Sequence, residues 1–218
     1  LMTKTAVVLF NLGGPDQLSS VQRFLFNLFS DPAIISLPQP LRWLVAQMAS
    51  RRRAPFAQDI YRKMGGGSPI LEQTNAQAQA LEERLGDEHQ VFVAMRYWHP
   101  LTEKTVADVA MYAPDRIVLL PLYPQFSTTT TGSSVTAWKK AAKSAGLTCL
   151  TTTICCYPIE PAFIEAHAQV LDTALREAIS GFGTDPSLVK VLFSAHGLPK
   201  RVIARGDPYD WQVEQTAA

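Results

Sequence analysis

The sequence predicts an α/β fold, because short apolar segments alternate along it with longer amphipathic ones. Five runs of apolar and β-branched residues are bounded by polar or turn residues and are typical of buried strands: residues 5–10, 90–95, 116–122, 148–155 and 188–193. Strands that are apolar along their whole length suit a sheet that is covered on both faces. We therefore predict parallel sheets with helices on both sides.

The segments between these strands carry helical patterns. In the first, apolar residues recur at the spacing of one helix face: Val21, Phe24, Leu25, Leu28 and Phe29. The second begins with a capping residue and a first-turn proline, Ser68 and Pro69, and ends at Gly86. Three further helices are predicted over residues 102–112, 133–145 and 161–179.

Two domains are predicted, and the second is incomplete. The first four strands and their helices can close a layered domain over residues 1–158. Residues 159–218 hold a long helix, the fifth strand and a final helix that Asp207 and Pro208 open, with no later strand to complete a second sheet. We therefore expect residues 159–218 to be part of a domain and the chain to be a fragment of a longer protein.

Composition and charge exclude several classes of protein. Hydrophobic residues make up 47% of the chain and charged residues 18%, which excludes a disordered protein. The 20 Lys and Arg residues nearly balance 19 Asp and Glu, so we expect no nucleic-acid partner. No run approaches the roughly 18 apolar residues of a membrane span, and the first residues lack a signal-peptide layout, which predicts a cytoplasmic protein. Three cysteines, at 149, 155 and 156, have neither disulfide-framework nor zinc-site spacing.

One window, residues 41–64, departs from the overall charge balance. It holds six cationic residues and a single carboxylate, Asp59, which gives it a net charge of +5. Such a window indicates either an anionic partner or a solvated face. The same region and the helix before it, residues 38–48 and 18–29, are rich in apolar residues. These residues either pack in the core or form a peripheral membrane contact through which a hydrophobic substrate enters.

Ligands of parallel sheets bind beyond the carboxyl ends of the strands, so the residues that follow each predicted strand are the candidate site. The glycines of NLGGP at 11–15 allow a flat ligand to approach the backbone, although the segment is not a dinucleotide fingerprint. After the second strand, Arg96 precedes two aromatic residues, a set that suits a planar anion or simply packs under a loop. After the third, four threonines at 128–131 lead into Gly132, Ser133 and Ser134 at a helix start, and their hydroxyl and N–H groups fit anion recognition or helix capping.

His196 is the strongest single candidate for chemistry. It follows the fifth predicted strand in a glycine-containing turn, where an imidazole can act as a base, bind a metal or be structural. No second ligand stands near it in the sequence, so spacing alone does not predict a metal site.

Eight segments occur in collinear order along the whole chain: NLGGP at 11–15, RRAP at 52–55, Tyr61, GGGSPI at 65–70, RYWHPLTE at 96–103, LPLYPQFSTTTTGSS at 120–134, SAHGLP at 194–199 and RGDPY at 205–209. Together they resemble the ferrochelatase family, in its bacterial type. The most specific are YPQFSTTTTGSS and SAHGLP. The resemblance implies two similar Rossmann-like domains with a porphyrin cleft, and insertion of ferrous iron into protoporphyrin IX to form protohaem.

The resemblance also assigns site residues. His196 matches the essential histidine of the family, taken as base for the pyrrole protons, as iron ligand, or as both. Three residues match porphyrin contacts of some relatives: Arg53, Tyr61 and Ser68. Three others match cleft-lining positions: Leu12, Arg96 and Tyr97. An arginine is a suitable partner for a propionate, and imidazole for Fe²⁺.

The sequence departs from the family pattern at its end. The glutamate expected opposite His196 falls beyond residue 218, so we expect reduced or no activity from this chain. Iron is expected as a substrate with no further cofactor, and the three cysteines do not match the [2Fe–2S] pattern of some relatives. The main alternative is a non-catalytic porphyrin or haem carrier. A chelatase for another metal or tetrapyrrole and a nucleotide-binding protein are disfavoured by the motifs.

Overall fold

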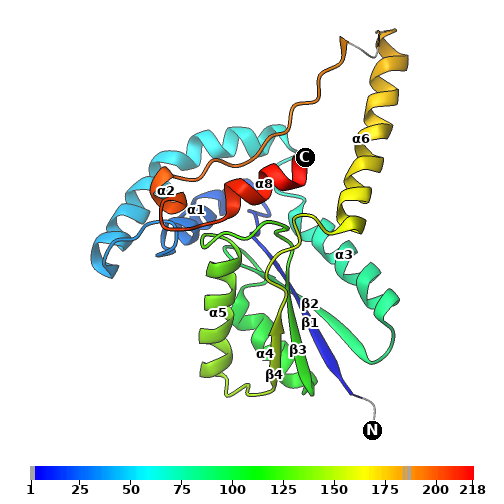
Figure 1. Ribbon diagram of the computed structural model, residues 1–218. Coiled ribbons are helices and arrows are strands. Elements are labelled where there is room, and N and C mark those ends of the chain that lie inside the picture. The colour runs from blue at the N-terminus through cyan, green and yellow to red at the C-terminus, as the bar shows by residue number, and fades with distance from the viewer. Residues whose placement is uncertain (1–2, 184, 186–187) are drawn as a thin grey trace. The chain divides into compact units, whose positions relative to one another are not determined.

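A parallel four-stranded sheet forms the centre of the larger of two units in the computed structural model, which describes residues 3–183, 185 and 188–218 (Figure 1). The larger unit comprises Leu1–Tyr123 and Thr128–Cys155, and the smaller comprises Pro124–Ser127 and Cys156–Ala218. The two units are described separately below.

The sheet has the strand order β2-β1-β3-β4, and all its pairings are parallel. Its strands are β1 (Thr5–Asn11), β2 (His89–Met95), β3 (Arg116–Pro121) and β4 (Leu150–Thr153). In the register, Val8 of β1 lies opposite Phe92 and Leu119. The α/β prediction and its first four strands are confirmed, with the fourth strand shorter than expected because it is an exposed edge.

Helices cover both faces of the sheet, since successive side chains of a strand point to opposite sides (Figure 1). On one face, Phe10 packs edge-on against Trp138, with ring centroids 6.0 Å apart. This face is covered by α4 (Thr102–Tyr112) and α5 (Thr131–Ser144). On the other face, Leu9 packs against Ala78 of α3 (Ile70–Leu85). The predicted helices at 102–112 and 133–145 and the one ending at Gly86 are thus confirmed, to within two residues.

Two helices pack together beside the carboxyl ends of the strands. After a short 3-10 turn, η1 (Leu18–Ser20), α1 (Val21–Phe29) lies against α2 (Gln39–Lys63). The helix α2 was not expected, because the residues it buries are small ones, Ala46, Ser50 and Ala54, which leave no apolar periodicity in the sequence. Among the residues that the structure describes, no helix has both the length and the apolar composition needed to cross a membrane.

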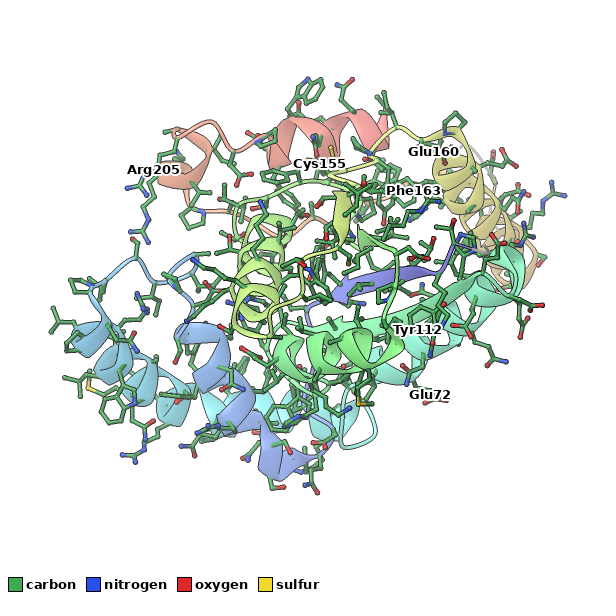
Figure 2. The ribbon with its side chains drawn as sticks, turned by 90° about the horizontal axis from the view of Figure 1, so that it is seen from below. Glu72, Tyr112, Cys155, Glu160, Phe163 and Arg205 are labelled. Atoms are coloured by element: carbon green, nitrogen blue, oxygen red, sulfur yellow. The ribbon has the colours of Figure 1, made fainter. Side chains whose placement is uncertain are left out.

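The smaller unit contains α6 (Pro161–Phe182), α7 (Lys200–Ile203) and α8 (Tyr209–Ala217). Glu160 caps α6, because its Oε2 accepts a hydrogen bond of 2.9 Å from the Phe163 amide, at the start of the helix in Figure 2. The prediction of a fifth strand at 188–193 is wrong. Leu192 is 89% exposed and Phe193 67%, and the described part of this unit holds no strand that could pair with this segment. The predicted domain boundary at 158 stays a prediction.

Candidate functional site

The parallel register of β1 and β2 brings three of the predicted site residues together. The Arg96 amide donates to the Asn11 carbonyl at 2.9 Å, and the Tyr97 amide donates to the Leu12 carbonyl at 3.0 Å. The Asn11 side chain fixes the turn, because its Oδ1 accepts from the Leu12 amide at 2.8 Å and its Nδ2 donates to Thr74 at 3.0 Å. Leu12, Arg96 and Tyr97 therefore lie side by side at the carboxyl edge of the sheet.

The two glycine segments of the sequence pack on each other at this edge. The Ser68 amide donates to the Pro15 carbonyl at 2.8 Å. A Cβ on Gly14 would lie 2.5 Å from the Ser68 Cβ, and one on Gly67 would lie 2.5 Å from the Asp16 carbonyl oxygen. These close approaches explain why both segments need glycine. They also place Ser68 beside the loop that carries Leu12.

The remaining two predicted porphyrin contacts lie on α2. The half-buried Tyr61 is joined to the glycine loop through its carbonyl, which accepts from the Gly66 amide at 2.8 Å. Burial raises the pKa of its phenol. Arg53 is exposed two turns earlier, about 12 Å away along the helix axis at the usual helical rise. The structure therefore groups Tyr61 and Ser68 around one loop and places Arg53 further along the helix.

A buried carboxylate, Asp31, is a residue that the sequence analysis missed. Its Oδ2 accepts hydrogen bonds from Arg96 Nη2 at 2.7 Å, from the Tyr97 hydroxyl at 2.8 Å and from the Ser133 hydroxyl. Arg96 Nε also donates to Ser133 at 2.7 Å, so the start of α5 joins the same network. Asp31 is 65 residues from Arg96, and no spacing in the sequence connects the two.

The network explains the environment of Tyr97. Its side chain has no exposed surface and packs against α1 and α2. The Arg96 guanidinium lies over its ring, 5.0 Å from the centroid. Burial, followed by the charge of Asp31, raises the pKa of the Tyr97 phenol far above its ordinary value. Tyr97 is therefore held as a neutral hydrogen-bond donor to Asp31.

His196 lies in the smaller unit, and its side chain is exposed. It lines a pocket of about 610 Å³ together with apolar residues of α7 and α8, among them Ile203, Tyr209 and Val213. No residue of the described segments forms a hydrogen bond or ion pair with it. Within the same segments, no group of three or more His, Cys, Asp or Glu side chains is arranged to hold a metal ion.

The helix α8, which forms one wall of this pocket, is anchored by polar contacts within the smaller unit. Gln212 Oε1 accepts from the Phe126 amide at 2.6 Å, and Asp207 Oδ2 accepts from the Ser127 hydroxyl at 3.0 Å. The Thr216 hydroxyl donates to the Pro158 carbonyl at 2.9 Å. The YPQFS and RGDPY segments, noted separately in the sequence, therefore meet here.

Comparison with known proteins matches a ferrochelatase family model to residues 4–218. The chain is 54% identical over 220 residues to a curated ferrochelatase of Caulobacter vibrioides (strain NA1000 / CB15N), a match that covers 99% of the chain and 61% of that relative. For a ferrochelatase of Hyphomonas neptunium the identity is 52%, covering 98% of the chain and 59% of the relative. For one of Pelagibacter ubique it is 46%, covering 98% and 61%. The chain thus spans 59% to 61% of the length of these relatives.

Proposed function

This chain belongs to the ferrochelatase family, and we propose that the whole protein inserts ferrous iron into protoporphyrin IX to form protohaem. The observation that carries the proposal is the family match along residues 4–218, together with the clustering of Leu12, Ser68, Arg96 and Tyr97 at one sheet edge. That edge is where parallel sheets bind their ligands.

We assign the central chemistry to His196. Two pyrrole protons leave as the metal enters, and a neutral imidazole can accept a proton or bind Fe²⁺ near neutral pH. Its exposure leaves the ring accessible to either partner. Arg53 is assigned to a propionate, with Tyr61 and Ser68 as further porphyrin contacts. Leu12, Arg96 and Tyr97 form the cleft wall. Iron enters this scheme as a substrate.

Metal insertion tests the proposal directly. The whole protein at the length of its relatives, called the completed protein below, is supplied with protoporphyrin, and porphyrin absorbance is followed with anaerobic Fe²⁺ or with Zn²⁺. We expect turnover by the completed protein, loss of turnover with His196→Ala, and weak turnover by the 218-residue chain. Porphyrin binding without turnover in the completed protein would favour the alternative, a non-catalytic porphyrin or haem carrier.

We also propose that α2 contacts an anionic membrane surface at its periphery. Several of its large apolar residues are exposed: Leu41, Leu44, Met48, Phe56 and Ile60. Cationic residues accompany them, including the exposed Arg51, Arg52 and Lys63. Exposed apolar side chains and exposed cations on the same helix can contact the apolar and the anionic parts of a membrane surface, respectively. The described cysteines form no disulfide, which supports a cytoplasmic location.

Vesicle binding tests this contact. The completed protein is expected to sediment with vesicles of phosphatidylglycerol and phosphatidylcholine and less with phosphatidylcholine alone. Replacing Arg51, Arg52 and Lys63 with glutamate is expected to abolish the difference. The matched control replaces three exposed lysines of α5 with glutamate: Lys139, Lys140 and Lys143. Equal loss in both variants would assign the binding to overall charge and contradict the proposal.

A further inference from the structure

Asp31 is a buried carboxylate, and both of its oxygens accept hydrogen bonds from other groups of the protein. Its side chain is 2% exposed, and its Oδ2 takes three donors, from Arg96, Tyr97 and Ser133. Its Oδ1 accepts from the Ala33 amide at 2.8 Å. A carboxylate with this many partners and so little exposure is not available to bind a metal or a substrate. Its effect on the site must pass through the groups that it holds.

Arg96 is the partner through which Asp31 reaches the candidate site. The Arg96 side chain is 23% exposed, and its backbone is bonded beside Leu12 at the carboxyl edge of the sheet. The ion pair with Asp31 cancels the arginine charge at this edge. Without the carboxylate, a single uncompensated cation would remain where, in the proposed function, a divalent cation must approach.

We propose that Asp31 is a positioning residue of the cleft wall: it fixes the Arg96 guanidinium and the Tyr97 ring, and it neutralises the wall so that the metal ion is not repelled. The inference rests on the proposed function, because it concerns the approach of the metal to the porphyrin. Asp31 would thus act through its charge on Arg96 and not only by holding neighbouring side chains in place.

The test is steady-state Zn²⁺ insertion by the completed protein carrying Asp31→Asn, which keeps the size of the side chain and removes its charge. The apparent KM for Zn²⁺ is expected to rise by roughly 3- to 10-fold, with the KM for protoporphyrin changed by less than about twofold. Because ions screen exposed charges over about 10 Å at 0.1 M salt, the Zn²⁺ defect is expected to shrink as KCl is raised. The matched control, Asp108→Asn, removes a surface carboxylate paired with Lys104 and is expected to leave both constants unchanged.

A second variant separates charge from structure. The effect of Asp31→Asn on the KM for Zn²⁺ is measured again in an Arg96→Met background, where no arginine charge remains, and is expected to be less than about twofold relative to Arg96→Met alone. A defect in Zn²⁺ KM that is insensitive to salt, or that is as large in the Arg96→Met background, would overturn the inference while leaving the proposed function intact. If Asp31→Asn does not fold, Arg96→Met decides: it leaves the Asp31 charge uncompensated and is expected to lower the KM for Zn²⁺, and a higher KM would overturn the inference. Absence of turnover in the unmodified completed protein would instead overturn the proposed function, and this inference with it.

Discussion

The surroundings of Tyr97 and those of His196 are constructed in opposite ways. Tyr97 has no exposed surface, its backbone is bonded to the end of β1, and its hydroxyl is bonded to Asp31. His196 lies on an exposed segment of the smaller unit and has no hydrogen-bond partner among the residues that the structure describes. Sheet-edge residues are thus placed by the same contacts that hold the larger unit together, whereas His196 can be altered without breaking any of those contacts. Stability and activity should therefore respond differently in the two regions.

The largest expected effect is the loss of stability in Asp31→Ala. Removal of this carboxylate leaves the Arg96 cation, which is largely buried, without its partner and breaks four hydrogen bonds at once. Breaking one partner of a buried pair costs about 3–5 kcal/mol, and urea unfolding followed by tryptophan fluorescence measures it. The control Asp108→Ala, at the surface, is expected to cost less than about 1 kcal/mol. Equal costs for the two variants would show that the sheet edge does not depend on Asp31.

Tyr97→Phe is expected to cost about 1.5–3 kcal/mol near pH 8, because the buried carboxylate loses one of its donors. The cost has a defined pH dependence. Burial and Asp31 raise the pKa of the folded phenol above its ordinary value of 10.0, so the contribution of this group to stability is present below pH 10 and is lost as pH rises beyond it. The unfolding free energies of parent and variant should therefore converge above pH 10, by about 1.4 kcal/mol per pH unit. A gap that is the same at pH 8 and pH 10.5 would contradict this account.

Much of the larger unit could be predicted from the sequence, because its signals are local. The apolar strands and the capped helices were predicted, and the position of Arg96 beside Leu12 follows from parallel strands ending at one edge. Asp31 could not be predicted, since only tertiary packing brings it to Arg96. The helix α2 was missed because it buries Ala46, Ser50 and Ala54 rather than large apolar residues. The prediction of a strand at 188–193 was wrong because a strand needs a neighbouring strand to pair with, and a local sequence pattern does not show whether one is present.

Gly14→Ala tests the packing of the two glycine segments. The added Cβ would lie 2.5 Å from the Cβ and Oγ of Ser68, so one loop must move, at a cost of about 1–3 kcal/mol. The matched control is Gly181→Ala in α6, where a Cβ would meet no atom within 4 Å. There the exchange is expected to be neutral or to stabilise by up to about 1 kcal/mol. The two variants are compared by their unfolding midpoints in urea. A Gly14→Ala midpoint equal to that of the parent would mean that the two loops are not in close contact.

The smallest expected effect on stability is that of His196→Ala. An exposed side chain without a described partner contributes little to the folded state, so its removal should change the unfolding free energy by less than about 0.5 kcal/mol. In the completed protein the same change is expected to abolish metal insertion. His196→Ala is thus expected to lose activity with almost no change in unfolding free energy. Tyr97→Phe is expected to show the reverse, because its main effect is a lower unfolding free energy. A loss of 2 kcal/mol or more on removing His196, about what a buried, bonded group contributes, would mean that His196 is held as firmly as Tyr97 and that the two regions do not differ.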